Sequence, residues 1–174
     1  MSPTQGLAQQ PLNSFLEADA ARADDELNRV YGLLVAALAK NPKGTTALRS
    51  AQRAWLVFRD AEVKAAGEAF GEGTGRRQVE AGTLGRLLQE RNAWLLLALA
   101  GKSALGSGKE RAAADAQLNA LWKTHEGTSR GPQRAWLAWR DAEVAFWSVY
   151  RGESTKDAVL TRLTWERCRA LSGG

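Results

Sequence analysis

The stretch QRAWLVFRDAEV at residues 52–63 returns almost unchanged as QRAWLAWRDAEV at residues 133–144, with ten of twelve positions identical. The segments that flank it return in the same order. Leu27-Asn28 and Glu90-Arg91 enclose the first copy, and Leu118-Asn119 and Glu166-Arg167 enclose the second. The offsets between equivalent residues fall along the chain from 91 to 81 to 76, as deletions in loops require. The sequence therefore predicts a tandem duplication of a unit of about 80 residues.

Each unit has the composition of helices. Ala, Leu, Arg, Glu and Gln dominate long stretches, and no segment alternates between apolar and polar residues as a half-buried strand does. Helices are expected at about residues 14–40, 45–70, 78–100, 110–123, 131–150 and 155–171. On the first of these, one apolar stripe is expected, formed by Ala20, Ala23, Leu27, Val30, Tyr31, Leu34 and Leu38. We predict an all-α fold in which two three-helix units, residues 13–100 and 109–174, form a six-helix bundle-like assembly. Residues 101–108 are expected to be the linker between them.

Composition excludes several classes of protein. The longest apolar run, residues 93–100, is far too short to cross a bilayer, which takes about 20 residues. A single cysteine, Cys168, and a single histidine, His125, leave no disulfide framework and no clustered metal site, so no cofactor or metal is expected. The N-terminus lacks the pattern of a signal peptide and is consistent with a mature start that carries an added methionine.

The net charge of +5 is unevenly distributed. Residues up to Gly101 carry +1 and the remainder carries +4, which predicts that an anionic partner would prefer the second half. Basic and acidic residues alternate along every expected helix, which disfavours nucleic-acid binding.

The repeated motif places charges on an apolar helix face. Arg59 and Glu62 fall within the apolar arc, three residues apart, so they are expected to pair, with Trp55 stacked on the guanidinium. Because an unpaired buried charge is costly, these residues form either a buried ion network between helices or a ligand site. The network is favoured, with Arg59→Ala or Arg140→Ala expected to lower the melting temperature sharply. The motif residues given this structural role are Trp55, Arg59, Asp60, Glu62, Arg91, Trp136, Arg140, Asp141, Glu143 and Arg167.

Other features are weaker. The glycines at 71, 73 and 75 superficially match a phosphate-binding loop but follow a helix and lack its Lys-Ser/Thr ending, which favours an ordinary connection. His125 near a helix end is expected to interact with the helix dipole. Trp147 is expected to be the most exposed tryptophan and to form a patch with Trp139 and Tyr150.

The doubled motif, with a Leu-Asn-x-x-Tyr segment before it and a Leu-x-Arg-Leu-x-x-Glu-Arg segment after it, resembles the LprI-like lysozyme-inhibitor domain of bacterial envelope proteins. The resemblance implies a small, helical, non-catalytic domain in the periplasm or cell envelope. It also implies a cysteine pair in each unit, for which this chain has Val63 and Thr83, and then Val144 and Val159. Both members of each pair are absent together, as expected for a lost disulfide.

The resemblance also implies a protein partner, a lysozyme-like or other peptidoglycan hydrolase, and a role as inhibitor or as immunity protein against a cell-wall-degrading toxin. Hydrolase clefts are lined with carboxylates, so arginines on the loops that follow the motif are the expected donors. The expected partner-binding residues are Glu72, Arg76, Arg77, Trp147, Arg151, Glu153 and Ser154. The overall positive charge favours an acidic or neutral hydrolase over a basic lysozyme.

Two alternatives are open. The chain could be a binding or scaffold module for cell-wall glycan or for another envelope protein, as the basic, tryptophan-rich second half suggests. An enzyme is disfavoured, since it would have to use carboxylates such as Glu72 and Glu153, and their spacing marks out no acid and base.

Overall fold

The computed structural model describes residues 4–73, 75–101, 105, 107–124 and 130–173. Within these ranges the chain forms six α-helices, a short 3₁₀ turn (η2, Glu153–Thr155) and no strand, so the predicted all-α fold is confirmed. The helices are α1 (Thr4–Ala37), α2 (Pro42–Phe70), α3 (Gly75–Ala100), α4 (Arg111–Thr124), α5 (Arg130–Arg151) and α6 (Lys156–Leu171).

Local sequence signals set the limits of α2. The Asn41 side chain accepts a hydrogen bond of 2.9 Å from the amide of Gly44, and Pro42 occupies the first turn, where no amide hydrogen is needed. The helix ends at Gly71, whose φ of +88° suits glycine. Each of the other boundaries lies within three residues of its prediction, except the start of α1, which lies ten residues earlier than expected.

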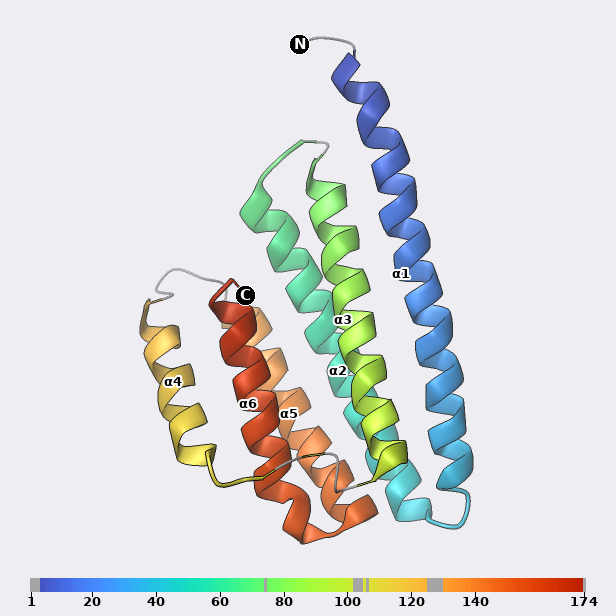
Figure 1. The fold of residues 1–174 in the computed structure, drawn as a ribbon, viewed down its shortest axis with the longest axis vertical. Coiled ribbons are helices and arrows are strands. Elements are labelled where there is room, and N and C mark those ends of the chain that lie inside the picture. Colours follow the sequence, from blue (N-terminus) through green and yellow to red (C-terminus); the bar gives the residue numbers. More distant parts are fainter. Residues whose placement is uncertain (1–3, 74, 102–104, 106, 125–129, 174) are drawn as a thin grey trace.

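The helices are arranged side by side, with α1 and α4 at the two outer edges and α2 and α5 at the centre (Figure 1). The outer helix α1 packs on α3, and the outer helix α4 packs on α6. The central pair, α2 and α5, carries the two copies of the motif and runs in opposite directions (Figure 1). The two three-helix groups therefore meet along their motif helices.

One continuous core runs through all six helices. On α1 it takes up Ala20, Leu27, Val30 and Leu34 of the predicted apolar stripe, and it also includes Leu38 in the turn that follows the helix. At the centre the rings of Phe58 and Trp139 stack with centroids 5.2 Å apart and join α2 to α5. Leu105, in the stretch predicted to be a linker, is only 5% exposed and belongs to the same core. This part of the connection therefore packs against the protein and does not behave as a solvated spacer.

Candidate functional site

A buried ion pair joins the two halves of the chain. Arg91 on α3 donates to Glu143 on α5 over 2.6 Å, and both side chains are fully buried. Arg91 also donates to Gln52 on α2 over 2.9 Å. The indole nitrogens of Trp139 and Trp147 lie 3.4 and 3.1 Å from the Glu143 carboxylate. Arg91 is therefore bound by a glutamine of its own half and by a glutamate of the other half.

The same arrangement occurs a second time with the halves exchanged. Arg167 on α6 donates to Gln133 on α5 over 3.0 Å and forms an ion pair with Glu62 on α2. Arg167 is nearly buried, and Glu62 is about one-fifth exposed. Gln52 and Gln133, Glu62 and Glu143, and Arg91 and Arg167 are equivalent residues of the two sequence copies. The contacts are thus reciprocal, as in a symmetric dimer.

The expected pairing within each motif is wrong. Arg59 donates to its neighbour Asp60 over 2.7 Å at the surface, with its guanidinium 5.4 Å from the ring centre of Trp55. Arg140 binds Asp141 in the same way, over Trp136. The physical reason is that Glu62 and Glu143 face the opposite half, where buried arginines bind them. Glu90 and Glu166 likewise pair with Arg86 and Arg162 on their own helices.

The predicted aromatic surface patch is also wrong. Trp147 is fully buried, because its indole binds Glu143 and its ring packs against Trp94 and Phe146. Trp139 is buried as well. Arg151 lies over the ring of Tyr150 and donates to the carbonyls of Ala98 and Leu99, at the C-terminal end of α3. Arg151 therefore satisfies free carbonyl groups of a helix end.

The two predicted binding loops lie at opposite ends of the molecule. The connection between α2 and α3 is at the top of Figure 1 and that between α5 and α6 at the bottom, since α2 and α5 run in opposite directions. Glu72 and Arg77 are exposed at the first end, where Arg76 pairs with Glu80 over 2.8 Å. Glu153 and Ser154 are exposed at the second end. The seven predicted residues thus form no single site.

Some sequence features fall outside what the structure describes. His125 lies outside the described residues, as does Thr74 in the glycine-rich loop. In that loop Gly71 and Gly73 have φ angles of +88° and +125°, so glycine is needed there for a tight connection between helices.

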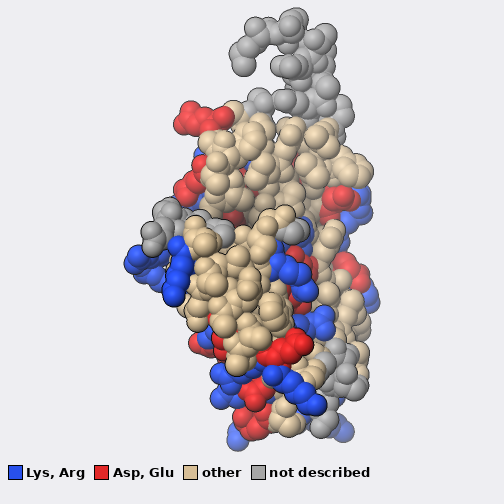
Figure 2. All heavy atoms as spheres, turned by 60° about the vertical axis from the view of Figure 1, so that its left-hand side comes forward, with Lys and Arg blue, Asp and Glu red and all other residues tan. Residues whose placement is uncertain are grey.

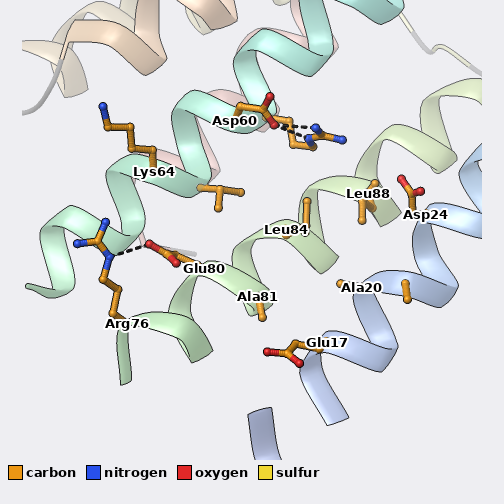
Figure 3. A pocket seen from close by; sticks show the side chains of 13 residues that line it. Glu17, Ala20, Asp24, Asp60, Lys64, Arg76, Glu80, Ala81, Leu84 and Leu88 are labelled. Carbon is orange, nitrogen blue, oxygen red and sulfur yellow. Dashed lines mark hydrogen bonds and ion pairs between the residues drawn. The ribbon is translucent and has the colours of Figure 1, made fainter. Parts of the chain in front are cut away.

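An open groove of about 680 Å³ lies between α1, α2 and α3 beside this loop (Figure 3). Its floor is apolar and includes Ala20, Ala81, Leu84 and Leu88. One wall carries Glu17 and Asp24 from α1, and the other carries Arg59, Asp60, Lys64, Arg76 and Glu80 from α2 and α3. Sequence reasoning missed this groove, although Glu17 and Asp24 stand seven residues apart and border the apolar stripe of α1, the spacing of one helix face.

A second groove of about 400 Å³ is lined by residues of α2, α3, α5 and α6, among them Trp94, Arg162 and Glu166. Glu166 accepts hydrogen bonds from the Trp94 indole over 2.7 Å and from Arg162 over 3.1 Å. Burial nevertheless raises the pKa of Glu166 above its usual value, and these donors together with Arg169 offset only part of that effect.

The surface shows no large region of one sign on the side where α4 comes forward. Lys and Arg as well as Asp and Glu side chains lie there around a broad area of uncharged residues (Figure 2). Among the described residues no helix is long and apolar enough to cross a membrane. The described residues also contain no group of three or more His, Cys, Asp or Glu side chains that could hold a metal ion.

Comparison with known proteins places the first half of the chain in a family. The family described as "Lysozyme inhibitor LprI" matches residues 2–95, which include α1, α2 and most of α3. An uncharacterised protein of Rhizobium meliloti (strain 1021) is 32% identical over 102 residues, which cover 52% of this chain and 73% of that protein. No solved structure matches the chain. Together with the helical fold, these matches show that the chain belongs to the LprI lysozyme inhibitor family.

Proposed function

We propose that this protein is a non-catalytic protein of the bacterial envelope that binds and inhibits a lysozyme-like peptidoglycan hydrolase. The observation that carries the proposal is the family match over residues 2–95, which spans most of the first three helices. We further propose that it acts as an immunity protein, which protects the cell that makes it from a cell-wall-degrading toxin.

We also propose that α4–α6 form a second LprI-like unit, with the division at residues 13–100 and 109–174. The repeated motif and the reciprocal pairs Arg91–Glu143 and Arg167–Glu62 support this division. In this proposal the buried charges of both units hold the two units together, and the second unit supports the first.

The partner is proposed to bind at the end formed by the α2–α3 loop, with Glu72, Arg76 and Arg77. Arg77 is exposed on the first turn of α3, where a guanidinium can reach the carboxylates of a glycosidase cleft. The opposite loop suits this role less well, because Arg151 is already bound to the carbonyls of Ala98 and Leu99.

The test is titration of the purified protein into a panel of muramidases, including any hydrolase encoded beside its gene, with cell-wall lysis and binding as the readouts. Arg77→Glu should weaken inhibition by about tenfold or more, the effect of losing a central charged contact. Arg49→Glu, an equal charge change at an exposed site on α2 far from this loop, is the matched control and should leave inhibition unchanged.

Absence of both binding and inhibition across the panel would overturn the proposed function. Pull-down with purified peptidoglycan belongs in the same experiment, since binding to the glycan without inhibition would indicate a scaffold module instead. Equal inhibition by the Arg77→Glu and Arg49→Glu variants would show that the hydrolase does not bind at the α2–α3 loop.

A further inference from the structure

The first helix is longer than the fold requires. From Leu12 onward the first buried side chain of α1 is Ala20, and none of the side chains from Leu12 to Asp19 is buried. When Leu27 is aligned with Leu118, the first residue of α4, Arg111, corresponds to Ala20. The part of α1 before Ala20 therefore has no counterpart in the second half. Figure 1 shows it passing the α2–α3 loop and continuing beyond the bundle.

This extension exposes large apolar side chains. Leu12 is 47% exposed and Phe15 is 59% exposed, on a segment whose other side chains from Asn13 to Asp19 are exposed or only partly buried. A helix of about 12 to 15 residues is marginal in water unless it packs against something. Large exposed apolar residues beside a groove are typical of protein interfaces.

The charge of α1 is opposite to that of the whole chain. The helix has five acidic and two basic residues, in a protein whose net charge is +5. Arg22 pairs with Asp19 and Arg29 with Glu26, so both basic residues are already bound within the helix. Glu17 and Asp24 have no ion pair among the described residues, and both line the groove (Figure 3).

The opposite wall of the groove is already neutralised. Arg59 is bound by Asp60, Lys64 lies 3.7 Å from Glu68, and Arg76 is bound by Glu80. A side chain at Gly67 would overlap Glu80, so the glycine leaves room for this last pair. Among the described residues that line the groove, the carboxylates without an ion pair are therefore Glu17 and Asp24, of which Asp24 accepts one hydrogen bond, from Asn28 over 3.1 Å.

We infer that the exposed face of α1 and the groove beside it are the docking surface for a positively charged partner, a basic peptidoglycan glycosidase. A lysine or arginine of the partner enters the groove, with its methylene stem on Leu84 and Leu88 and its charge near Glu17 and Asp24. Phe15 packs against an apolar area of the partner surface. The inference rests on the proposed function and specifies the partner: a basic enzyme, where the overall charge suggested an acidic or neutral one.

A membrane fits this surface less well than a protein. Helices that bind at lipid headgroups carry Lys and Arg on their polar face, and anionic lipids repel carboxylates. From Thr4 to Ala21 the sequence contains Glu17 and Asp19 but no lysine or arginine. The charge of the extension therefore favours a cationic protein surface.

The experiment uses the full chain and two probe enzymes, a lysozyme with an isoelectric point above about 9 and a muramidase with one below about 6. Inhibition and dissociation constants are measured at about 0.05 M and about 0.5 M NaCl. The variants are Glu17→Lys with Asp24→Lys, and Phe15→Ala. Their matched controls are Glu110→Lys with Asp157→Lys, which are exposed in the second half, and Leu96→Ala, which is 45% exposed on α3.

The inference expects tighter binding of the basic enzyme, weakened by the higher salt. It expects a loss of about tenfold or more in affinity for the double charge reversal and for Phe15→Ala, and less than about twofold for either control. Preference for the acidic enzyme, or a double reversal that matches its control, would overturn it. So would Phe15-dependent binding to vesicles of phosphatidylglycerol and phosphatidylethanolamine without enzyme binding. If neither these probes nor any enzyme of the wider panel is inhibited, the proposed function itself fails.

Discussion

At the residue scale, stability depends on two buried arginines and less on the arginines of the motif. Arg91 and Glu143 are fully buried and 2.6 Å apart. Removing one partner of a buried pair leaves the other charge without compensation, which costs about 3 to 5 kcal/mol. We predict that Arg91→Ala lowers the free energy of unfolding by that amount in urea denaturation.

The control for this prediction is Arg86→Ala. Arg86 pairs with Glu90 one turn away, and both side chains are about half exposed, so the loss should be about 0.5 kcal/mol or less. Arg59→Ala should cost less than Arg91→Ala, because the Arg59 pair with Asp60 lies at the surface. Equal losses for Arg91→Ala and Arg86→Ala would show that the buried pair does not stabilise the fold.

A second residue-scale prediction concerns pH. Because burial raises the pKa of Glu166 in the folded protein, the folded state holds this proton more tightly than the unfolded state. This stabilisation of the folded state is fully present below the pKa that Glu166 has in the unfolded chain. It is lost as the pH rises through the higher pKa that Glu166 has in the folded protein. The stability of Glu166→Gln relative to wild type should therefore increase between about pH 4 and pH 7, as measured by urea denaturation. A constant difference would contradict the prediction, and Glu153→Gln, exposed on η2, is the control.

At the scale of the element, we expect the extension of α1 to contribute to binding of the hydrolase but little to the stability of the fold. No side chain from Leu12 to Asp19 is buried, so removal of residues 2–18 takes away none of the core side chains that the structure describes, the first of which is Ala20. We predict that this truncation changes the melting temperature by less than about 3 °C, as surface changes do. Inhibition of the hydrolase should fall by about tenfold or more. A large drop in melting temperature, measured by circular dichroism, would show that the extension belongs to the fold instead.

Helix positions could be predicted from the sequence because their signals are local. Asn41 and Pro42 mark the start of α2, and Gly71 marks its end. Apolar spacing placed Leu27, Val30 and Leu34 in the core. Periodicity gives the face of a helix on which a residue lies, but it cannot say which helix packs there. For this reason the predicted pair of Arg59 with Glu62 and the predicted exposure of Trp147 are both wrong.

At the scale of the whole molecule, the sequence did not predict that each buried arginine pairs with a glutamate of the other half. Each buried arginine binds a glutamine of its own half and a glutamate of the other half, through contacts 39 and 52 residues apart for Arg91. Such pairings depend on how two units dock, which repeated sequence alone does not encode. The groove beside α1 escaped prediction for the same reason, since its walls come from three helices.

From these contacts between the halves we predict that the two halves unfold together. Arg91–Glu143, Arg167–Glu62 and the Phe58–Trp139 stack all cross between the halves, so neither half keeps its buried charges paired alone. Five of the seven tryptophans lie after Gly101, so fluorescence reports mainly on the second half, whereas far-ultraviolet circular dichroism reports on all six helices. The two signals should follow one coincident urea transition, which Arg91→Ala and Arg167→Ala each move as a whole to lower urea. Two separate transitions, or a variant that shifts only one signal, would show that the halves are independent domains that touch without depending on each other.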